Sequence, residues 1–120
     1  MKYIYIAGPY TGKTHDYRSY FEIHRHIIDA LEMSREVARL GYGFFCPHQH
    51  SAHFEVIAPG IKPDYWYELD LHFMLACDAV LLLHGWRKSK GTREEVRVAH
   101  LHGIPVYKSI NELLAKMPVD

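Results

Sequence analysis

The chain has 120 residues, with 14 lysines and arginines against 14 aspartates and glutamates, so its formal net charge is zero. This length predicts one domain, residues 1–120, and the balanced charge argues against a nucleic-acid-binding or membrane-surface protein. Two cysteines provide no disulfide framework, and no apolar run approaches the ~20 residues that span a bilayer. The chain opens on a strand pattern rather than a signal peptide, so we expect a cytoplasmic protein.

Strand and helix patterns alternate from the first residues onward. Residues 2–7 predict a strand, and residues from about 16 to 40 predict a long helix, because small and apolar side chains recur there at helical spacing. Gly41 is a helix stop, and residues 43–46 predict a short second strand. Residues 47–62 then predict a long loop rich in His, Pro and Gly, and a loop of this length is typical of a lid or binding loop.

The second half of the chain continues the alternation. The predicted elements are a helix from Pro63 or Asp64 to about Cys77, a strand over 78–83, a helix from about Arg93 to His102, a strand over 104–107, and a helix from Ile110 to about Lys116 capped by Ser109. This order predicts an α/β fold of Rossmann-like or flavodoxin-like type. We expect a parallel sheet of about four to five strands in the order 2-1-3-4, with helices on both faces.

Two glycine-bearing loops follow two of the predicted strands. The loop over 8–13 (GPYTGK) follows the first strand, and the loop over 89–92 (SKGT) comes shortly after the apolar run at 79–83. Parallel strands bring their carboxyl ends to one edge of the sheet, where helix N-termini offer free N–H groups. We therefore expect one ligand pocket between the first loop and residues 89–95. The loop over 8–13 has the spacing of neither a P-loop nor a dinucleotide-binding fingerprint.

Glu95 has two interpretations. The run from Thr92 to Glu95 fits a capping box, in which the Thr92 hydroxyl accepts from the Glu95 N–H and the Glu95 side chain returns to the Thr92 N–H. Alternatively, Glu95 is a carboxylate at the sheet edge that attacks a sugar carbon. Judged by spacing alone, capping is the commoner role.

Other polar and aromatic candidates also have simple structural explanations. Asp70, near the middle of its predicted helix, would by itself be a surface charge, and Asp78 would be a turn residue. Trp66 and Trp86 would pack in the core, although an aromatic ring can also stack on a flat base.

Three histidines crowd the loop over 47–62. His48, His50 and His53 match no familiar zinc spacing and have no cysteine partners at suitable positions, so we expect no metal site. We expect instead that His48 and His53 are polar loop residues that reach over a ligand.

Short motifs spread over nearly the whole chain form an ordered set. They are residues 4–12 (IYIAGPYTG), Gly41-Tyr42, Cys46-Pro47-His48, residues 51–55 (SAHFE), Asp70, Cys77-Asp78-Ala79-Val80, and Ser89-Lys90-Gly91-Thr92 through Glu95 to Ala99. This ordered set resembles the nucleoside 2-deoxyribosyltransferase-like family, in particular a small branch without an assigned activity.

The resemblance implies a role for each candidate residue. Glu95, in the Gly-Thr-x-x-Glu turn, would be the nucleophile that attacks the anomeric carbon of a nucleoside. Asp70 would donate a proton to the leaving base or orient it, and Tyr10 would help to place the nucleophile and the sugar. No cofactor is expected. The remaining candidates would contact the substrate: Gly8, Pro9, Thr11, Gly12, Ser89, Gly91, Thr92, His48 and His53.

The predicted activity is cleavage or transfer of the N-glycosidic bond of a (deoxy)nucleoside or a nucleoside 5′-monophosphate. Lys13, Arg18 and Lys90 lie near the two loops in sequence and slightly favour the phosphate. Two alternatives stay open. One is a non-catalytic nucleotide-binding or sensing module on the same fold. The other is a phosphoribohydrolase of the related Rossmann-like group, whose usual Pro-Gly-Gly is replaced here by residues 85–89 (GWRKS).

The long first helix predicts a homo-oligomer with pockets near a subunit interface. It is longer than short strands need for cover, and it carries Tyr17, Tyr20 and Phe21 near its start. Zero net charge also favours self-association.

Overall fold

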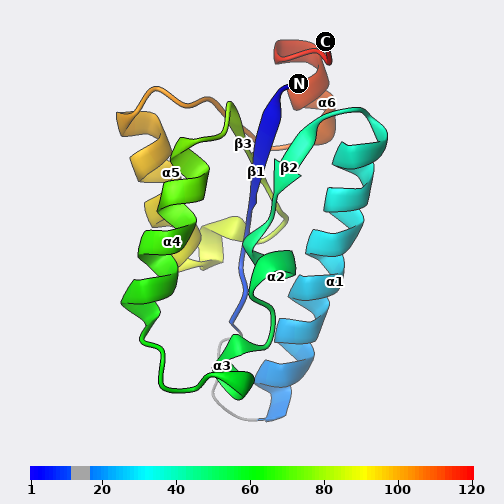
Figure 1. The fold of residues 1–120 in the computed structure, drawn as a ribbon. Helices are drawn as coiled ribbons and strands as arrows, with labels where there is room; N and C mark the ends of the chain where they lie inside the picture. Colours follow the sequence, from blue (N-terminus) through cyan, green and yellow to red (C-terminus); the bar gives the residue numbers. More distant parts are fainter. Residues whose placement is uncertain (12–16) are drawn as a thin grey trace.

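A four-stranded parallel sheet forms the centre of the protein. In the computed structural model, which describes residues 1–11 and 17–120, the strands lie in the order β2-β1-β3-β4 (Figure 1). The elements are β1 (Tyr3–Ala7), α1 (Tyr17–Arg39), β2 (Gly43–Phe45), α2 (Pro47–His50), α3 (Phe54–Ile57), α4 (Pro63–Leu75), β3 (Ala79–Leu82), the 3-10 helix η1 (Trp86–Lys88), α5 (Lys90–Leu101), β4 (Val106–Tyr107) and α6 (Ile110–Lys116). The predicted α/β class and strand order are confirmed.

Each face of the sheet buries its own apolar core, because successive strand side chains point to opposite faces. On one face, Ile4 and Ile6 of β1 pack with side chains of α1 and α6. On the other face, Tyr5 and Ala7 of β1 pack with side chains of α4 and α5. The predicted helices on both faces are confirmed, and the alternation directs Tyr5 toward α5.

The helix α1 is 23 residues long and ends shortly before Gly41, whose φ of 100° lies in the left-handed region that favours glycine. Tyr20 and Phe21 are exposed, as a partner surface requires, and the oligomer itself stays a prediction. No helix in the described part of the chain is long and apolar enough to cross a membrane.

The segment over 47–62, predicted as an irregular loop, contains two helices of four residues each, α2 and α3. Pro47 is the first residue of α2, where its missing N–H needs no partner. The helix α2 packs against α1, where the Gln49 side chain donates to the Ile27 carbonyl at 3.3 Å. These two short helices place the His-rich segment over the carboxyl edge of the sheet.

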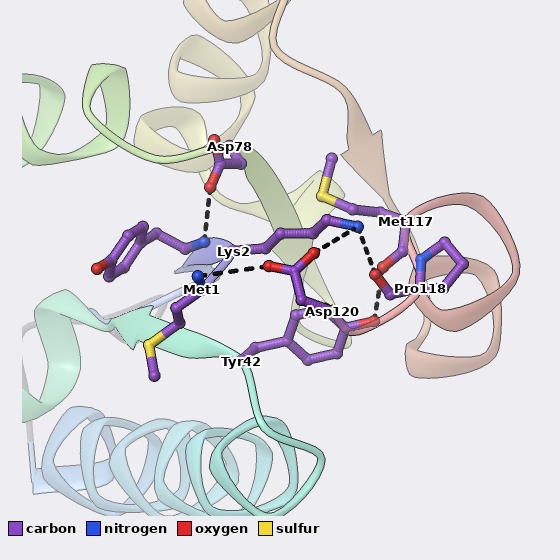
Figure 2. Close-up of polar contacts among 8 residues, drawn as sticks. Met1, Lys2, Tyr42, Asp78, Met117, Pro118 and Asp120 are labelled. Atoms are coloured by element: carbon purple, nitrogen blue, oxygen red, sulfur yellow. Dashed lines mark hydrogen bonds and ion pairs between the residues drawn. The ribbon is translucent and has the colours of Figure 1, made fainter.

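The amino edge of the sheet is closed by contacts between the two ends of the chain (Figure 2). Lys2 Nζ donates to the Pro118 carbonyl at 2.5 Å and lies 3.4 Å from the Asp120 carboxylate. The Asp78 carboxylate accepts from the Tyr3 N–H at 2.7 Å. Asp78 therefore holds the backbone at this edge, in agreement with the structural role predicted for it.

Candidate active site

A pocket of about 550 Å³ lies at the carboxyl edge of the sheet, at the other end of β1 from the contacts in Figure 2. Its volume is within the usual range for small-molecule sites. The lining residues are Ala7, Gly8, Tyr10, Thr11, Pro47, His48, Ser51, Phe54, Glu55, Pro59, Ile61, Pro63, Trp66, Asp70, Ser89, Gly91, Thr92 and Glu95. The pocket thus lies between the two loops, as predicted.

Gly8 starts the first of these loops where the chain passes very close to β3. A Cβ atom on Gly8 would lie 2.5 Å from the Cβ of Leu83, a contact that real side chains do not make. The glycine therefore allows the loop after β1 to lie against the end of the neighbouring strand and to form one wall of the pocket.

Glu95 lies in the second turn of α5, so its interpretation as part of a helix cap is wrong. The helix begins at Lys90, and Ser89 is the N-cap, with its Oγ accepting from the Thr92 N–H at 3.2 Å. Ser89 and Thr92 are both good capping residues, and the earlier one allows another turn of helix with Thr92 buried inside it. This leaves the Glu95 side chain free for another role.

The Glu95 carboxylate accepts a hydrogen bond from the hydroxyl of Tyr5. Tyr5 is fully buried in β1, and its burial, reinforced by the charge of Glu95, raises its pKa well above 10. The phenol therefore keeps its proton and acts as a donor at all physiological pH values. A strand side chain 90 residues earlier in the sequence thus fixes the position of the carboxyl group.

Burial also raises the pKa of Glu95 to about 7. Removal of the carboxyl group from water is the largest cause, the hydrogen bond from Tyr5 opposes it, and the charge of Asp70 adds to it. A carboxyl group that exchanges its proton near neutral pH is a common property of catalytic sites.

Asp70, on α4, lines the same pocket, so the prediction that it is a surface charge is wrong. Its Oδ1 atom is buried and has no hydrogen-bond partner among the described residues. Burial raises the pKa of Asp70 to about 6. Because buried polar atoms are nearly always paired in folded proteins, an unpaired oxygen at the pocket wall is suited to a ligand.

Tyr10 connects the first loop to the segment around α3. Its hydroxyl donates to Glu55 Oε2 at 2.8 Å and accepts from the backbone N–H of His53 at 2.7 Å. Burial is the main cause that raises the pKa of Tyr10 to about 12, so the hydroxyl stays protonated. His53 has a φ of 67°, in the left-handed region, and this turn delivers its N–H to Tyr10.

His48 lines the pocket and also holds the loop after β1 through the Pro9 carbonyl. Its ring is buried, and its Nε2 lies 2.7 Å from the Pro9 carbonyl. Burial lowers the pKa of His48, which favours a neutral ring with the proton on Nε2 toward Pro9. Across the described residues, no three or more His, Cys, Asp or Glu side chains are grouped so as to hold a metal ion.

The start of α5 offers polar groups to the pocket. Ser89 Oγ accepts from the Thr92 N–H and from the Thr92 hydroxyl, the latter at 2.9 Å, so its own proton is left to donate to a ligand. A Cβ atom on Gly91 would meet nothing within 4 Å, which shows open space beside this turn. Lys90 is exposed and does not line the pocket, contrary to the expectation that it favours a phosphate there.

Aromatic rings form another part of the pocket wall. Phe54 and Trp66 meet edge to face with ring centroids 5.1 Å apart, and both line the pocket. A flat base has π faces that such rings can contact.

The structure brings most of the predicted site residues to one pocket. Those that line it are Gly8, Tyr10, Thr11, His48, Asp70, Ser89, Gly91, Thr92 and Glu95. Pro9 and His53 do not line it and act through their backbone groups on His48 and Tyr10. Gly12 lies outside the described residues. Which of these residues bind a substrate stays a prediction.

Two site residues, Tyr5 and Glu55, were missed by sequence reasoning. Tyr5 carried a usable signal, because a tyrosine within a buried strand needs a partner for its hydroxyl. Glu55 carried none beyond its place in the SAHFE motif, since its contact with Tyr10 joins residues 45 positions apart.

Comparisons with known proteins concern the family and the fold of the chain. Residues 2–108 match the family described as Domain of unknown function (DUF4406). A solved 2-deoxyribosyltransferase from the psychrotolerant bacterium Bacillus psychrosaccharolyticus superposes with a TM-score of 0.59 at 19% identity, over 98% of this chain and 82% of the other. This likeness confirms the fold that the resemblance implied. A search of curated protein sequences gives no match.

Proposed function

The chain belongs to the DUF4406 family, and from its pocket we propose that it is an enzyme that cleaves or transfers the N-glycosidic bond of a nucleoside or nucleoside 5′-monophosphate. The observation that carries the proposal is the pair of carboxyl groups, Glu95 and Asp70, that line one pocket with raised pKa values. The likeness of the fold to that of a solved 2-deoxyribosyltransferase supports the same class of reaction.

In the first step, the ionised Glu95 attacks the anomeric carbon of the sugar. Tyr5 holds Oε2, which leaves Oε1 to form the new C–O bond. The bond between the anomeric carbon and the base nitrogen breaks, and its electron pair stays on the nitrogen. Protonated Asp70 donates its proton to the departing base, so the products are a glycosyl ester on Glu95, a neutral base and an Asp70 carboxylate.

In the second step, an acceptor base or water replaces Glu95 at the anomeric carbon. Asp70, now ionised, removes a proton from the acceptor as the new bond forms, and the ester bond to Glu95 breaks. Both carboxyl groups thereby return to their starting protonation states. Retention of configuration follows from two successive displacements at one carbon.

The two pKa values allow the pair to share one proton near neutral pH. Because the pKa of Glu95 is about 7 and that of Asp70 is about 6, the form with Glu95 ionised and Asp70 protonated is the less populated of the two singly protonated forms, and it is the form that reacts. Burial raises the pKa of Asp70 to about 6, so the group can hold a proton at mildly acidic pH. The hydrogen bond from Tyr5 lowers the pKa of Glu95, in opposition to burial, and favours the ionised nucleophile. Positive charge that develops on the sugar would lower the pKa of Glu95 further, because an opposite charge favours the ionised form.

A non-catalytic binding module is the principal alternative, and the unpaired Oδ1 of Asp70 argues against it. A buried carboxyl oxygen without a partner destabilises the fold. A module that only binds nucleotides gains nothing from two carboxyl groups whose pKa values are raised by burial, whereas a proton donor and a nucleophile can use them.

A screen for released base tests the proposal. The purified protein is incubated with a set of nucleosides, deoxynucleosides and their 5′-monophosphates, with and without a second base, and free and exchanged bases are measured by chromatography. We expect base release or exchange for at least one compound, and loss of both in Glu95→Gln. Glu94→Gln is the matched control, because Glu94 is adjacent on α5 and pairs with Arg97 outside the pocket.

The pattern of products separates the alternatives. Binding without any released base from the unaltered protein supports the binding module. Release from ribonucleoside 5′-monophosphates alone supports the phosphoribohydrolase.

A further inference from the structure

The pocket wall is acidic. Glu55, Asp70 and Glu95 all line it, and no lysine or arginine is among the described lining residues. His48 adds no positive charge, because burial lowers its pKa and its Nε2 faces the Pro9 carbonyl. At pH 8, Asp70 and Glu95 are mostly ionised, since their pKa values are about 6 and about 7.

Glu55 takes no part in the bond-breaking steps proposed above, yet it is held against the pocket. Its Oε2 accepts from the Tyr10 hydroxyl at 2.8 Å, and Tyr10 in turn is held by the His53 N–H. An exposed glutamate normally moves freely in solvent. Here the hydrogen bond from a half-buried, protonated tyrosine keeps its negative charge at the pocket mouth.

We propose that Glu55 makes this site select uncharged nucleosides over nucleoside 5′-monophosphates. The proposal rests on the proposed function of the same pocket and names its substrate class. It does not depend on the pose of the ligand. A cavity of about 550 Å³ is roughly 10 Å across, so a phosphate placed anywhere inside lies within about one Debye length of all three carboxylates.

Among the described residues of the wall, the start of α5 is the feature that attracts anions, and it is too weak to reverse the preference that these residues set. Lys13 and the side chain of Arg18, which favoured a phosphate in the sequence, lie outside the described part of the chain. A helix N-terminus carries about half a positive charge, whereas the wall carries three carboxylates. Lys90 could add a full charge, but it is exposed and outside the lining.

Calorimetric titration at pH 8 tests the selection. Deoxynucleosides and their 5′-monophosphates are titrated into the unaltered protein, Glu55→Gln and Glu68→Gln, and the ratio of the two dissociation constants is compared. We expect the nucleoside to bind at least about tenfold more tightly in the unaltered protein, and the ratio to fall about threefold or more in Glu55→Gln. Glu68, exposed on α4 outside the pocket, should leave the ratio unchanged.

Salt and catalysis provide two further readouts. An electrostatic preference must shrink when sodium chloride rises from about 50 mM to about 500 mM. Monophosphates that bind as tightly as nucleosides, or a ratio that Glu55→Gln does not change, overturn the proposal. A preference for nucleosides without base release leaves this inference standing and rejects the proposed function. Failure of both ligand classes to bind rejects both.

Discussion

The two edges of the sheet hold their carboxyl groups in opposite ways. At the amino edge, Asp120 is exposed, and its hydrogen bond with the amino-terminal ammonium together with the charge of Lys2 lowers its pKa (Figure 2). At the carboxyl edge, burial raises the pKa values of Glu95 and Asp70, and no cation lies beside them in the described lining. Paired exposed charges serve the fold, whereas buried unpaired charges weaken it and are suited to chemistry.

The largest expected effect is the loss of activity on removal of the Glu95 carboxylate. Glu95→Gln should lower the rate of base release by about a thousandfold or more, because an amide cannot form the glycosyl ester. Asp120→Asn, at the amino edge, should retain the full rate. The measurement is kcat with the substrate found in the screen. Equal losses in both variants would remove the distinction between the edges.

The pH dependence of the rate should follow from the carboxyl pair. One group must be ionised and the other protonated, so kcat/KM should follow a bell-shaped curve with limbs near pH 6 and pH 7. Asp70→Asn should lower the rate about a hundredfold and remove the alkaline limb. The single limb that remains should be an acid limb at the pKa of Glu95, which loss of the Asp70 charge lowers from about 7. A bell that keeps both limbs in Asp70→Asn contradicts the assignment.

The free energy of unfolding should show that the buried charge of Glu95 destabilises the protein. The pKa of Glu95 rises from 4.5 to about 7 on folding, so its favourable contribution is complete below pH 4.5 and is lost as the pH rises through 7. Glu95→Gln, whose amide oxygen can still accept from Tyr5, should therefore stabilise the protein at pH 8 by up to about 3 kcal/mol. Urea denaturation at pH 8 and pH 4.5 tests this, and the gain must vanish at the lower pH.

Tyr5→Phe should have a smaller effect, which tests whether Tyr5 positions the nucleophile. Loss of the hydrogen bond raises the pKa of Glu95, so the limb of the rate profile near pH 7 should move to higher pH. We expect a fall in kcat of about tenfold and a loss of about 1 kcal/mol of stability. A purely structural role would lower stability without any shift in the pH profile.

The smallest effect should come from the exposed charges at the amino edge. Asp120→Asn should lower the melting temperature slightly, because solvent and salt screen its contact with Lys2. The difference from the unaltered protein should disappear in about 0.5 M sodium chloride. A large, salt-independent loss would show that this edge also holds a charge shielded from solvent.

Local sequence determined the elements whose signals lie within a few residues of one another. Three such features could be predicted: the buried strand β1, the end of α1 near Gly41, and the cap that Ser109 gives to α6. Apolar runs, glycine and capping hydroxyls act on residues close to them in the sequence. The order of the elements then restricts the sheet to few topologies, and the strand order followed.

Tertiary structure decided the choices that local signals left equal. Ser89 and Thr92 could each cap α5, and packing selected Ser89, which buries Thr92 and frees Glu95 for the pocket. The contact between Tyr5 and Glu95 joins residues 90 positions apart. Asp70 became a half-buried acid with a buried Oδ1 atom, because α4 places it at the pocket wall. Burial depends on what the rest of the chain places against a residue, and so the carboxyl pair could be named from sequence but its altered pKa values could not.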